Sequence, residues 1–132
     1  QKYAYIIVPN KGTAKEMEAY EVGNIQICEN SDSIQAVYHR KLDILEIVFL
    51  RESTFNFKDL EITTDKPAAM IVKDLGSNKI TLHVADPSQL KEMISISVLC
   101  PSMLSKPQLV PVDLRNSGVY AGKTNYYVIN KE

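Results

Sequence analysis

The sequence contains only two histidines, which are the first residues to consider for acid–base chemistry. His83 alternates outward from an apolar strand pattern, so an exposed residue without a catalytic role is the simpler interpretation. His39 lies in Tyr38-His39-Arg40-Lys41, the most basic part of the chain. This group could contact an acidic sugar, or it could be the charged end of a strand that leads into a turn at Lys41–Asp43. The strand-end interpretation is the simpler one.

Aromatic side chains could also bind a sugar, because the apolar face of a pyranose stacks on a flat ring. The sequence has no Trp, seven Tyr and three Phe. In Tyr126-Tyr127 one ring should point into the fold and the other out, because successive side chains of a strand alternate. Either ring could make one sugar contact, although packing at a sheet edge explains the pair more simply. The candidate carbohydrate contacts are therefore His39, Arg40 and Tyr127.

Other chemical motifs are missing from the sequence. The five glycines are dispersed in turns, so there is no glycine-rich phosphate loop, and no GxSxG, HExxH or calcium-loop pattern is present. Cys28 and Cys100 are far apart and belong to no CxxC or Cys/His cluster, which argues against a zinc site. The two cysteines are either buried free thiols or a disulfide. We predict no catalytic residue, no metal site and no cofactor in this chain.

The composition is that of an ordinary globular protein of 132 residues, which can bury a core of its own. The net charge is −1, and 15 basic and 16 acidic residues are mixed along the chain. No run of like charges is long enough to indicate a nucleic-acid partner, and no apolar run approaches the roughly 20 residues of a membrane helix. We therefore expect neither nucleic acid nor membrane as a partner.

Alternation of apolar and polar residues is the main structural signal. Ile80, Leu82 and Val84 share one face of a strand, and Phe55 and Phe57 share a face that most simply belongs to the core. About nine or ten short strands separated by turns are typical of an all-β antiparallel sandwich in two sheets. Besides 80–85 and 94–99, the strands are expected at 3–8, 25–29, 34–40, 44–51, 68–73, 109–115 and 124–130.

One short helix is expected at residues 13–22. Thr13 and Glu16 have the spacing of a capping box, Met17 and Tyr20 form an apolar stripe, and Gly23 is positioned to end the helix. No linker or repeat interrupts the chain, so residues 1–132 are expected to form a single domain. Because the strand pattern begins at residue 3 without an initiator Met or a signal peptide, we expect the chain to be a fragment of a larger protein.

Five segments, in order along the chain, resemble the C-terminal domain of family 8 polysaccharide lyases, the bacterial chondroitin AC, hyaluronate and xanthan lyases. The segments are Tyr3-Ala4-Tyr5-Ile6-Ile7-Val8-Pro9-Asn10, Glu18-Ala19-Tyr20, Ile34-Gln35-Ala36-Val37-Tyr38-His39-Arg40-Lys41-Leu42, Ile62-Thr63-Thr64-Asp65-Lys66-Pro67 and Val84-Ala85-Asp86-Pro87-Ser88-Gln89. The resemblance covers about residues 3–90 and is looser beyond them. The turn Asn10-Lys11-Gly12 departs from the family, which usually has small apolar residues there.

The resemblance implies a small antiparallel β-sandwich without catalytic residues, since the family's catalytic Asn, His, Tyr and Arg lie in an N-terminal helical toroid. It implies a secreted or periplasmic parent enzyme that cleaves uronic-acid polymers by β-elimination. The expected partners are the upstream central β-domain, which this sandwich would buttress, and the helical catalytic domain of the same polypeptide. An acidic polysaccharide is a further candidate partner.

Two alternatives remain open at the level of the sequence. A free-standing carbohydrate-binding module has the same fold class, although the absence of Trp and the net charge of −1 argue against tight binding of a polyanion. An adhesive sandwich from a larger surface protein would bind a protein instead of a sugar.

Overall fold

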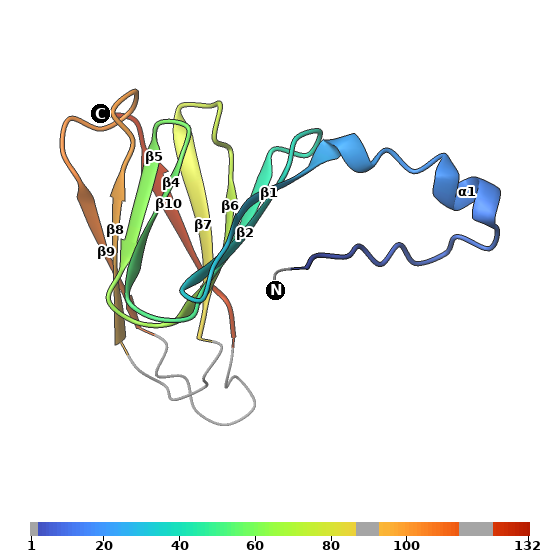
Figure 1. The fold of residues 1–132 in the computed structure, drawn as a ribbon. Coiled ribbons are helices and arrows are strands. Elements are labelled where there is room, and N and C mark those ends of the chain that lie inside the picture. Colours follow the sequence, from blue (N-terminus) through green and yellow to red (C-terminus); the bar gives the residue numbers. More distant parts are fainter. Residues whose placement is uncertain (1–2, 87–92, 114–122) are drawn as a thin grey trace.

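The computed structural model describes residues 3–86, 93–113 and 123–132, which form ten strands, a short α-helix and a short 3-10 helix (Figure 1). The helices are α1 (Ala14–Glu18) and η1 (Val22–Asn24). The strands are β1 (Ile25–Asn30), β2 (Ile34–His39), β3 (Ile44–Phe49), β4 (Ser53–Phe57), β5 (Leu60–Thr64), β6 (Ala68–Lys73), β7 (Lys79–Ala85), β8 (Met93–Leu99), β9 (Gln108–Asp113) and β10 (Asn125–Asn130).

The strands form two antiparallel sheets. A six-stranded sheet has the order β1-β2-β3-β6-β7-β10, and a four-stranded sheet has the order β4-β5-β8-β9. The chain leaves the first sheet after β3, forms the hairpin β4–β5 in the second, and returns as β6 beside β3. The prediction of an all-β antiparallel sandwich is confirmed.

The core lies between the two sheets and consists of the inward-pointing half of each strand. On β3, Leu45, Ile47 and Phe49 are buried while Glu46 is exposed, and on β8 the buried residues are Ile94, Ile96 and Val98. Each buried aliphatic or aromatic side chain contributes roughly 1.5–3 kcal/mol by leaving water. This alternation also determines which side chains remain on the two outer faces.

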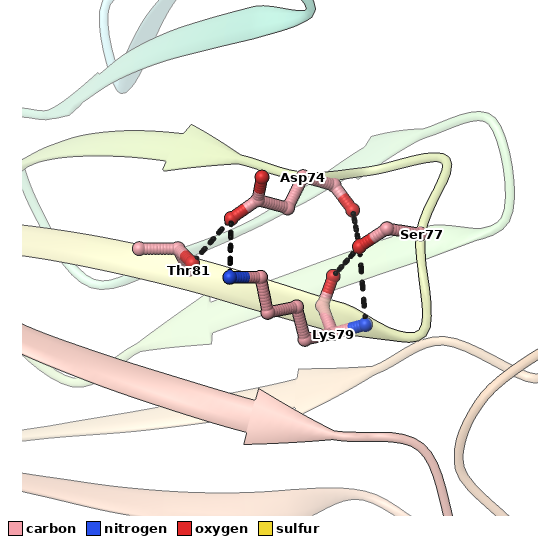
Figure 2. A network of polar contacts seen from close by, with 4 residues as sticks. All are labelled: Asp74, Ser77, Lys79 and Thr81. Carbon is pink, nitrogen blue, oxygen red and sulfur yellow. Dashed lines mark hydrogen bonds and ion pairs between the residues drawn. The ribbon is translucent and has the colours of Figure 1, made fainter.

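The β6–β7 turn is held by a network of polar side chains, which Figure 2 shows in close-up. Asp74 has a φ of 65° and accepts a 2.6 Å hydrogen bond from the Thr81 hydroxyl on its Oδ2. The same oxygen lies 3.8 Å from Lys79 Nζ. Ser77 donates its backbone N–H to the Asp74 carbonyl, and its Oγ accepts from the Lys79 N–H. Asp tolerates the left-handed conformation because its short polar side chain bonds locally.

The region before β1 differs from the sequence-based expectation. Residues 3–8 form no strand ladder with any described part of the chain, so the strand expected there is absent from the described structure. The helix is shorter than 13–22: α1 ends at Glu18, and Gly23 lies in η1 instead of ending α1. The predicted capping box is confirmed, since Thr13 Oγ1 accepts from the Glu16 N–H and Glu16 accepts from the Thr13 N–H.

The hairpin β4–β5 was only partly expected from the sequence, which placed Phe55 and Phe57 on one strand face but predicted no strand at 60–64. Lys58 makes its short turn possible by adopting a φ of 55°, which few residues other than Gly, Asn and Asp adopt. The turn therefore carries none of the usual Asn-Gly or Asp-Gly signal. The remaining strands agree with the expected ranges to within about two residues at their ends, as is usual for such boundaries, while positions 114 and 115 of the strand expected at 109–115 lie outside the described residues.

Candidate functional site

His39 and Arg40 lie at the end of β2, where they stabilise the local backbone. His39 Nδ1 accepts a 3.3 Å hydrogen bond from the Leu42 N–H, inside the turn that leads to β3. Arg40 Nη2 donates to Gln26 Oε1 at 3.1 Å, and the Arg40 N–H donates to the Asn24 carbonyl at 2.8 Å. These contacts account for both side chains as parts of a strand end and a turn.

Tyr38, in the same basic group, points into the sandwich and connects the two sheets. Its ring centroid lies 4.8 Å from that of Phe57, and Lys58 Nζ lies 4.5 Å above it. The hydroxyl donates to Asp43 Oδ1 at 2.7 Å and accepts from Lys58 Nζ at 3.2 Å. An ammonium over aromatic rings is stabilised by the negative charge of the ring face, so this cluster joins β2 to the β4–β5 turn.

A shallow hollow of about 260 Å³ lies beside His39. Its lining combines residues of β2 and its turn with residues before β1: Lys11, Ala19, Tyr20, Glu21, Asn24, His39 and Lys41. Lys11 and Lys41 bring positive charge to this hollow, and Glu21 brings negative charge while accepting a 2.9 Å hydrogen bond from Asn24. Arg40 does not line it.

Tyr127 lies far from His39 and Arg40. It is on β10, at the opposite edge of the six-stranded sheet from β1, and it is half-buried against the core. Four strand spacings separate β10 from β2 in the sheet order, or roughly 19 Å at about 4.8 Å per spacing. The structure therefore brings His39 and Arg40 together but leaves Tyr127 apart. As sugar contacts, the three residues stay predictions.

Tyr126 and His83, in contrast, do lie together on the outside of the six-stranded sheet. Their ring centroids are 5.2 Å apart in an edge-on arrangement. They belong to a row of residues that the strand register aligns across the sheet: Ile27, Val37, Glu46, Ile71, His83 and Tyr126. A second row contains Gln35, Val48, Ala69 and Ala85.

The outer side of this sheet is rich in apolar side chains. We call it the outer apolar face, and define it by Ile27, Val37, Val48, Ala69, Ile71, Ala85, Tyr126 and Val128. Five of these are exposed large side chains: Ile27, Val37, Ile71, Tyr126 and Val128. A hollow of about 340 Å³ in this face is lined by Glu46, Val48, Ala69, Ile71, His83 and Ala85, among others. Contiguous exposed apolar surface of this kind usually marks an interaction site.

The outer side of the four-stranded sheet is chemically different. It presents hydroxyl, amide and carboxylate groups from Thr54, Asn56, Glu61, Thr63, Ser95 and Ser97. Thr54 and Thr63 hydrogen-bond to each other at 2.8 Å. Large exposed apolar side chains on this sheet are limited, within the described residues, to Met93 and Leu109. Among the described residues, the outer side of the six-stranded sheet is therefore the one with the composition of an interaction surface.

The outer apolar face was not predicted from the sequence, although a signal for it was present. Residues 44–49 and 68–72 are apolar on both strand faces with the single exception of Glu46. Continuous apolar strands are typical of sheets covered on both sides, whereas a solvated antiparallel sheet alternates cleanly.

Comparison with known proteins identifies the family of this sandwich. The family model described as polysaccharide lyase family 8, C-terminal beta-sandwich domain, matches residues 26–95. The chain belongs to this family. The matched segment begins within β1 and includes β2 to β7, so it contains every residue of the outer apolar face except Tyr126 and Val128 on β10.

Similar proteins include two bacterial lyases and a solved structure. Chondroitinase-AC of Pedobacter heparinus is 30% identical over 97 residues, covering 74% of this chain and 14% of that protein. Xanthan lyase of a Bacillus species is 30% identical over 88 residues, covering 66% of this chain and 9% of that protein. A structure of chondroitinase AC lyase, determined with oligosaccharide complexes, has a TM-score of 0.73 and 26% identity, covering 91% of this chain and 17% of that one. The chain therefore spans a small part of these relatives.

Both thiols of this family 8 domain are free. The structure therefore has free cysteines and not the disulfide that the sequence left possible. Burial raises the pKa of the Cys28 thiol, and it does the same for Cys100, where a Ser102 hydrogen bond partly opposes the shift. A raised pKa keeps a thiol protonated and poorly nucleophilic at neutral pH. Neither cysteine therefore has the environment of a reactive thiol.

Two absences concern the described part of this family 8 domain. Among these residues no group of three or more His, Cys, Asp or Glu side chains is arranged to hold a metal ion. No described helix is long and apolar enough to cross a membrane.

Proposed function

We propose that this chain is the non-catalytic C-terminal sandwich, residues 1–132, of a secreted or periplasmic polysaccharide lyase, and that it buttresses the central domain of that enzyme. The observation that carries the proposal is the contrast between the two outer faces of the sandwich. Apolar side chains gather on the six-stranded sheet, while hydroxyl and amide groups dominate the four-stranded sheet. Covering the outer apolar face with another domain would remove its exposed Ile, Val and Tyr side chains from water.

The family supports the reaction proposed for the parent enzyme. Relatives are named chondroitinase-AC and xanthan lyase, and this chain matches 14% and 9% of their lengths. We propose that the parent protein likewise cleaves an uronic-acid polymer of the glycosaminoglycan type by β-elimination, in parts of the polypeptide outside this chain. Hyaluronan and chondroitin are the substrates to test first.

The arrangement of the two histidines supports a non-catalytic role. β-Elimination needs a base near the C5 proton, a proton donor for the leaving oxygen, and a group that neutralises the carboxylate. His39 Nδ1 accepts a hydrogen bond from the Leu42 N–H. His83 packs against Tyr126 and lies on β7, three strand spacings from β2. This distance, roughly 14 Å at about 4.8 Å per spacing, is too large for the two rings to act on one sugar ring.

The catalytic part of the proposal is tested with the purified chain alone. Incubation with chondroitin sulfate or hyaluronan should produce no unsaturated uronide, which is followed by its ultraviolet absorbance. Production of that absorbance by this chain would refute a non-catalytic role.

The buttressing part is tested by comparing the chain alone with the longer polypeptide encoded by its gene. Ile71→Asp adds a charge to the outer apolar face and should lower the melting temperature of the longer polypeptide without changing that of the chain alone. Asn56→Asp adds the same charge to the exposed outer side of β4 and serves as the matched control. Equal effects of the two substitutions on the longer polypeptide would contradict the proposal.

A further inference from the structure

The segment 3–8, which we call the N-terminal segment, has the composition of a strand covered on both faces. Its six residues are Tyr, Ala, Tyr, Ile, Ile and Val, all apolar or aromatic and mostly strong strand formers. A strand with one solvated face would alternate with polar residues, whereas this one does not. The composition therefore predicts a position inside a β-sheet with a layer on each side.

The described structure does not provide that position. Tyr3, Tyr5 and Ile7 are 79%, 73% and 78% exposed, and Ile6 on the other side is 41% exposed. Successive side chains of an extended chain point to opposite sides, so both faces of the segment are uncovered. The Tyr3 and Tyr5 rings nevertheless stack with an interplanar angle of 12° and a centroid distance of 6.3 Å, as neighbours on one strand face do.

The backbone of the N-terminal segment also lacks sheet partners. No backbone–backbone hydrogen bond joins residues 3–8 to another described residue. One side chain reaches the segment: Asn30 Nδ2 donates to the Tyr3 carbonyl at 3.3 Å. The nearest sheet edge is β1, whose ladder is irregular between Ile27 and Glu29, and the segment does not pair with it. Apart from the Tyr3 carbonyl, its backbone donors and acceptors are therefore available to another strand.

The position of the segment connects it with the outer apolar face. Tyr3 and Tyr5 line a hollow of about 470 Å³ together with Ile27 and Val37 of that face. Figure 1 shows the residues before β1 as a loop that projects to one side of the sandwich: the dark-blue N-terminal segment leads out to α1 at the far end, and the chain then comes back to β1. The segment therefore runs where a further layer over the six-stranded sheet would lie.

We propose that residues 3–8 form a β-strand in a sheet of the preceding domain of the same polypeptide, and that this sheet packs over the outer apolar face. The proposal rests on the proposed function and names the partner: a β-sheet with an open strand position. Main-chain hydrogen bonds would hold the strand, and apolar pockets would receive Tyr3, Tyr5 and Ile7. The family match begins at residue 26 and therefore does not include the segment.

The first test is hydrogen exchange at the backbone amides of residues 4–8. In the chain alone these amides should exchange as fast as unstructured ones, whereas amides of β3 and β6 should be protected. In the longer polypeptide the amides of 4–8 should become protected. Fast exchange in both proteins would overturn the proposal, as would a gene that encodes no strand-rich region before Gln1. Protection in the chain alone that grows with protein concentration would overturn it too, since the partner would then be a second copy.

The second test uses proline, which removes one backbone donor. Ile6→Pro and Ile7→Pro should leave the melting temperature of the chain alone unchanged, since their amides have no described partner there. In the longer polypeptide both proline variants should lower the melting temperature by several degrees if the strand is paired on both sides. If the strand lies at a sheet edge, only one of the two variants should do so. Ile6→Ala and Ile7→Ala keep the donor and are the matched controls. No effect of either proline beyond its alanine control would overturn the proposal.

The two proposals can fail separately. If Ile71→Asp destabilises the longer polypeptide and both proline variants do not, the sandwich buttresses its partner without donating a strand. If Ile71→Asp has no effect as well, the buttressing function itself is refuted.

Discussion

At the residue scale, the polar side chains of this domain mainly satisfy turns. Asp74 and Tyr38 bond to groups 7 and 5 residues away in sequence, Asp59 accepts from Cys100, 41 residues away, and each of the three lies at or near a tight turn between strands. A buried hydroxyl or a left-handed turn residue needs such a partner, because an unsatisfied polar group loses its bonds to water without compensation. The charged residues here therefore support the fold more than a reaction.

Asp74→Ala is expected to destabilise the fold by about 1–3 kcal/mol, because it removes the acceptor of the buried Thr81 hydroxyl. Asp74→Asn keeps an acceptor and tolerates the positive φ, so it should cost clearly less. Lys79→Ala should cost less than about 1 kcal/mol, since its 3.8 Å ion pair with Asp74 is exposed. Urea unfolding of the three variants checks the order, and an equal loss for Lys79→Ala and Asp74→Ala would contradict it.

Asp59 provides a prediction about acid. A hydrogen bond from the Ser102 hydroxyl, and a weaker one from the Cys100 thiol, hold the pKa of Asp59 below its ordinary value of 3.8. A folded-state pKa below the unfolded one stabilises the fold at pH values above about 3.8, and the stabilisation is lost as the pH falls through the folded-state pKa.

Ser102→Ala should therefore raise the pKa of Asp59 toward its ordinary value, as measured by NMR titration of the Asp59 carboxyl carbon. It should also lower the melting temperature slightly at neutral pH, with the difference from the native sequence shrinking in acid. Ser95→Ala, on the outer side of β8, is the control and should not move the titration. An unchanged Asp59 pKa in Ser102→Ala would refute the assigned cause.

At the element scale, the strands and the N-terminal helix contribute very differently to stability. The two sheets pack against each other through core side chains such as Phe49, which is fully buried. In contrast, α1 has no buried residue, and its capping box lies at the end of a projecting loop. The helix α1 forms because of the local helix propensity and capping of its residues, whereas the sandwich forms because side chains of the two sheets pack together. A helix of this length has little stability of its own.

Thr13→Ala should consequently weaken α1 by about 0.5–2 kcal/mol and leave the global melting temperature unchanged. Phe49→Ala should lower the unfolding free energy by about 3–5 kcal/mol, because it creates a cavity in the core. Thermal unfolding followed by circular dichroism compares the two. A drop in global melting temperature for Thr13→Ala similar to that for Phe49→Ala would show that α1 packs on the sandwich after all.

At the scale of the whole molecule, the main feature is that only one of the two sheets has an apolar outer side. Exposed apolar surface of this kind favours association because covering it releases ordered water. In a longer protein another domain would supply the cover. In a solution of the chain alone, a second copy would supply such a cover.

The chain alone is therefore expected to self-associate weakly at high concentration. Ile71→Asp should shift the equilibrium toward the monomer, since pairing two copies would bury a new charge. Sedimentation equilibrium over a range of concentrations measures this, with Asn56→Asp as the control. Association that is equally strong in the native chain and in Ile71→Asp would place the contact on another surface.

The sequence alone was sufficient for the fold class, most strands, the capping box and the family. Those features depend on local patterns: the alternation in Ile80, Leu82 and Val84 assigns one face of a strand to the core wherever the strand lies in the sheet. The order of the strands, however, results from pairings such as β3 with β6 and β7 with β10, which join residues far apart in the chain. Only the tertiary structure decides them.

The candidate site depended on those same long-range pairings. His39 and Arg40 are neighbours in sequence and remain together, while Tyr127 lies at the opposite edge of the six-stranded sheet, because the strand order separates β10 from β2. Conversely, Val37, Ile71 and Tyr126 come from three distant strands and meet on one face through the register alone. Alternation along a strand determines which side chains point outward, but the sheet order determines which outward side chains become neighbours.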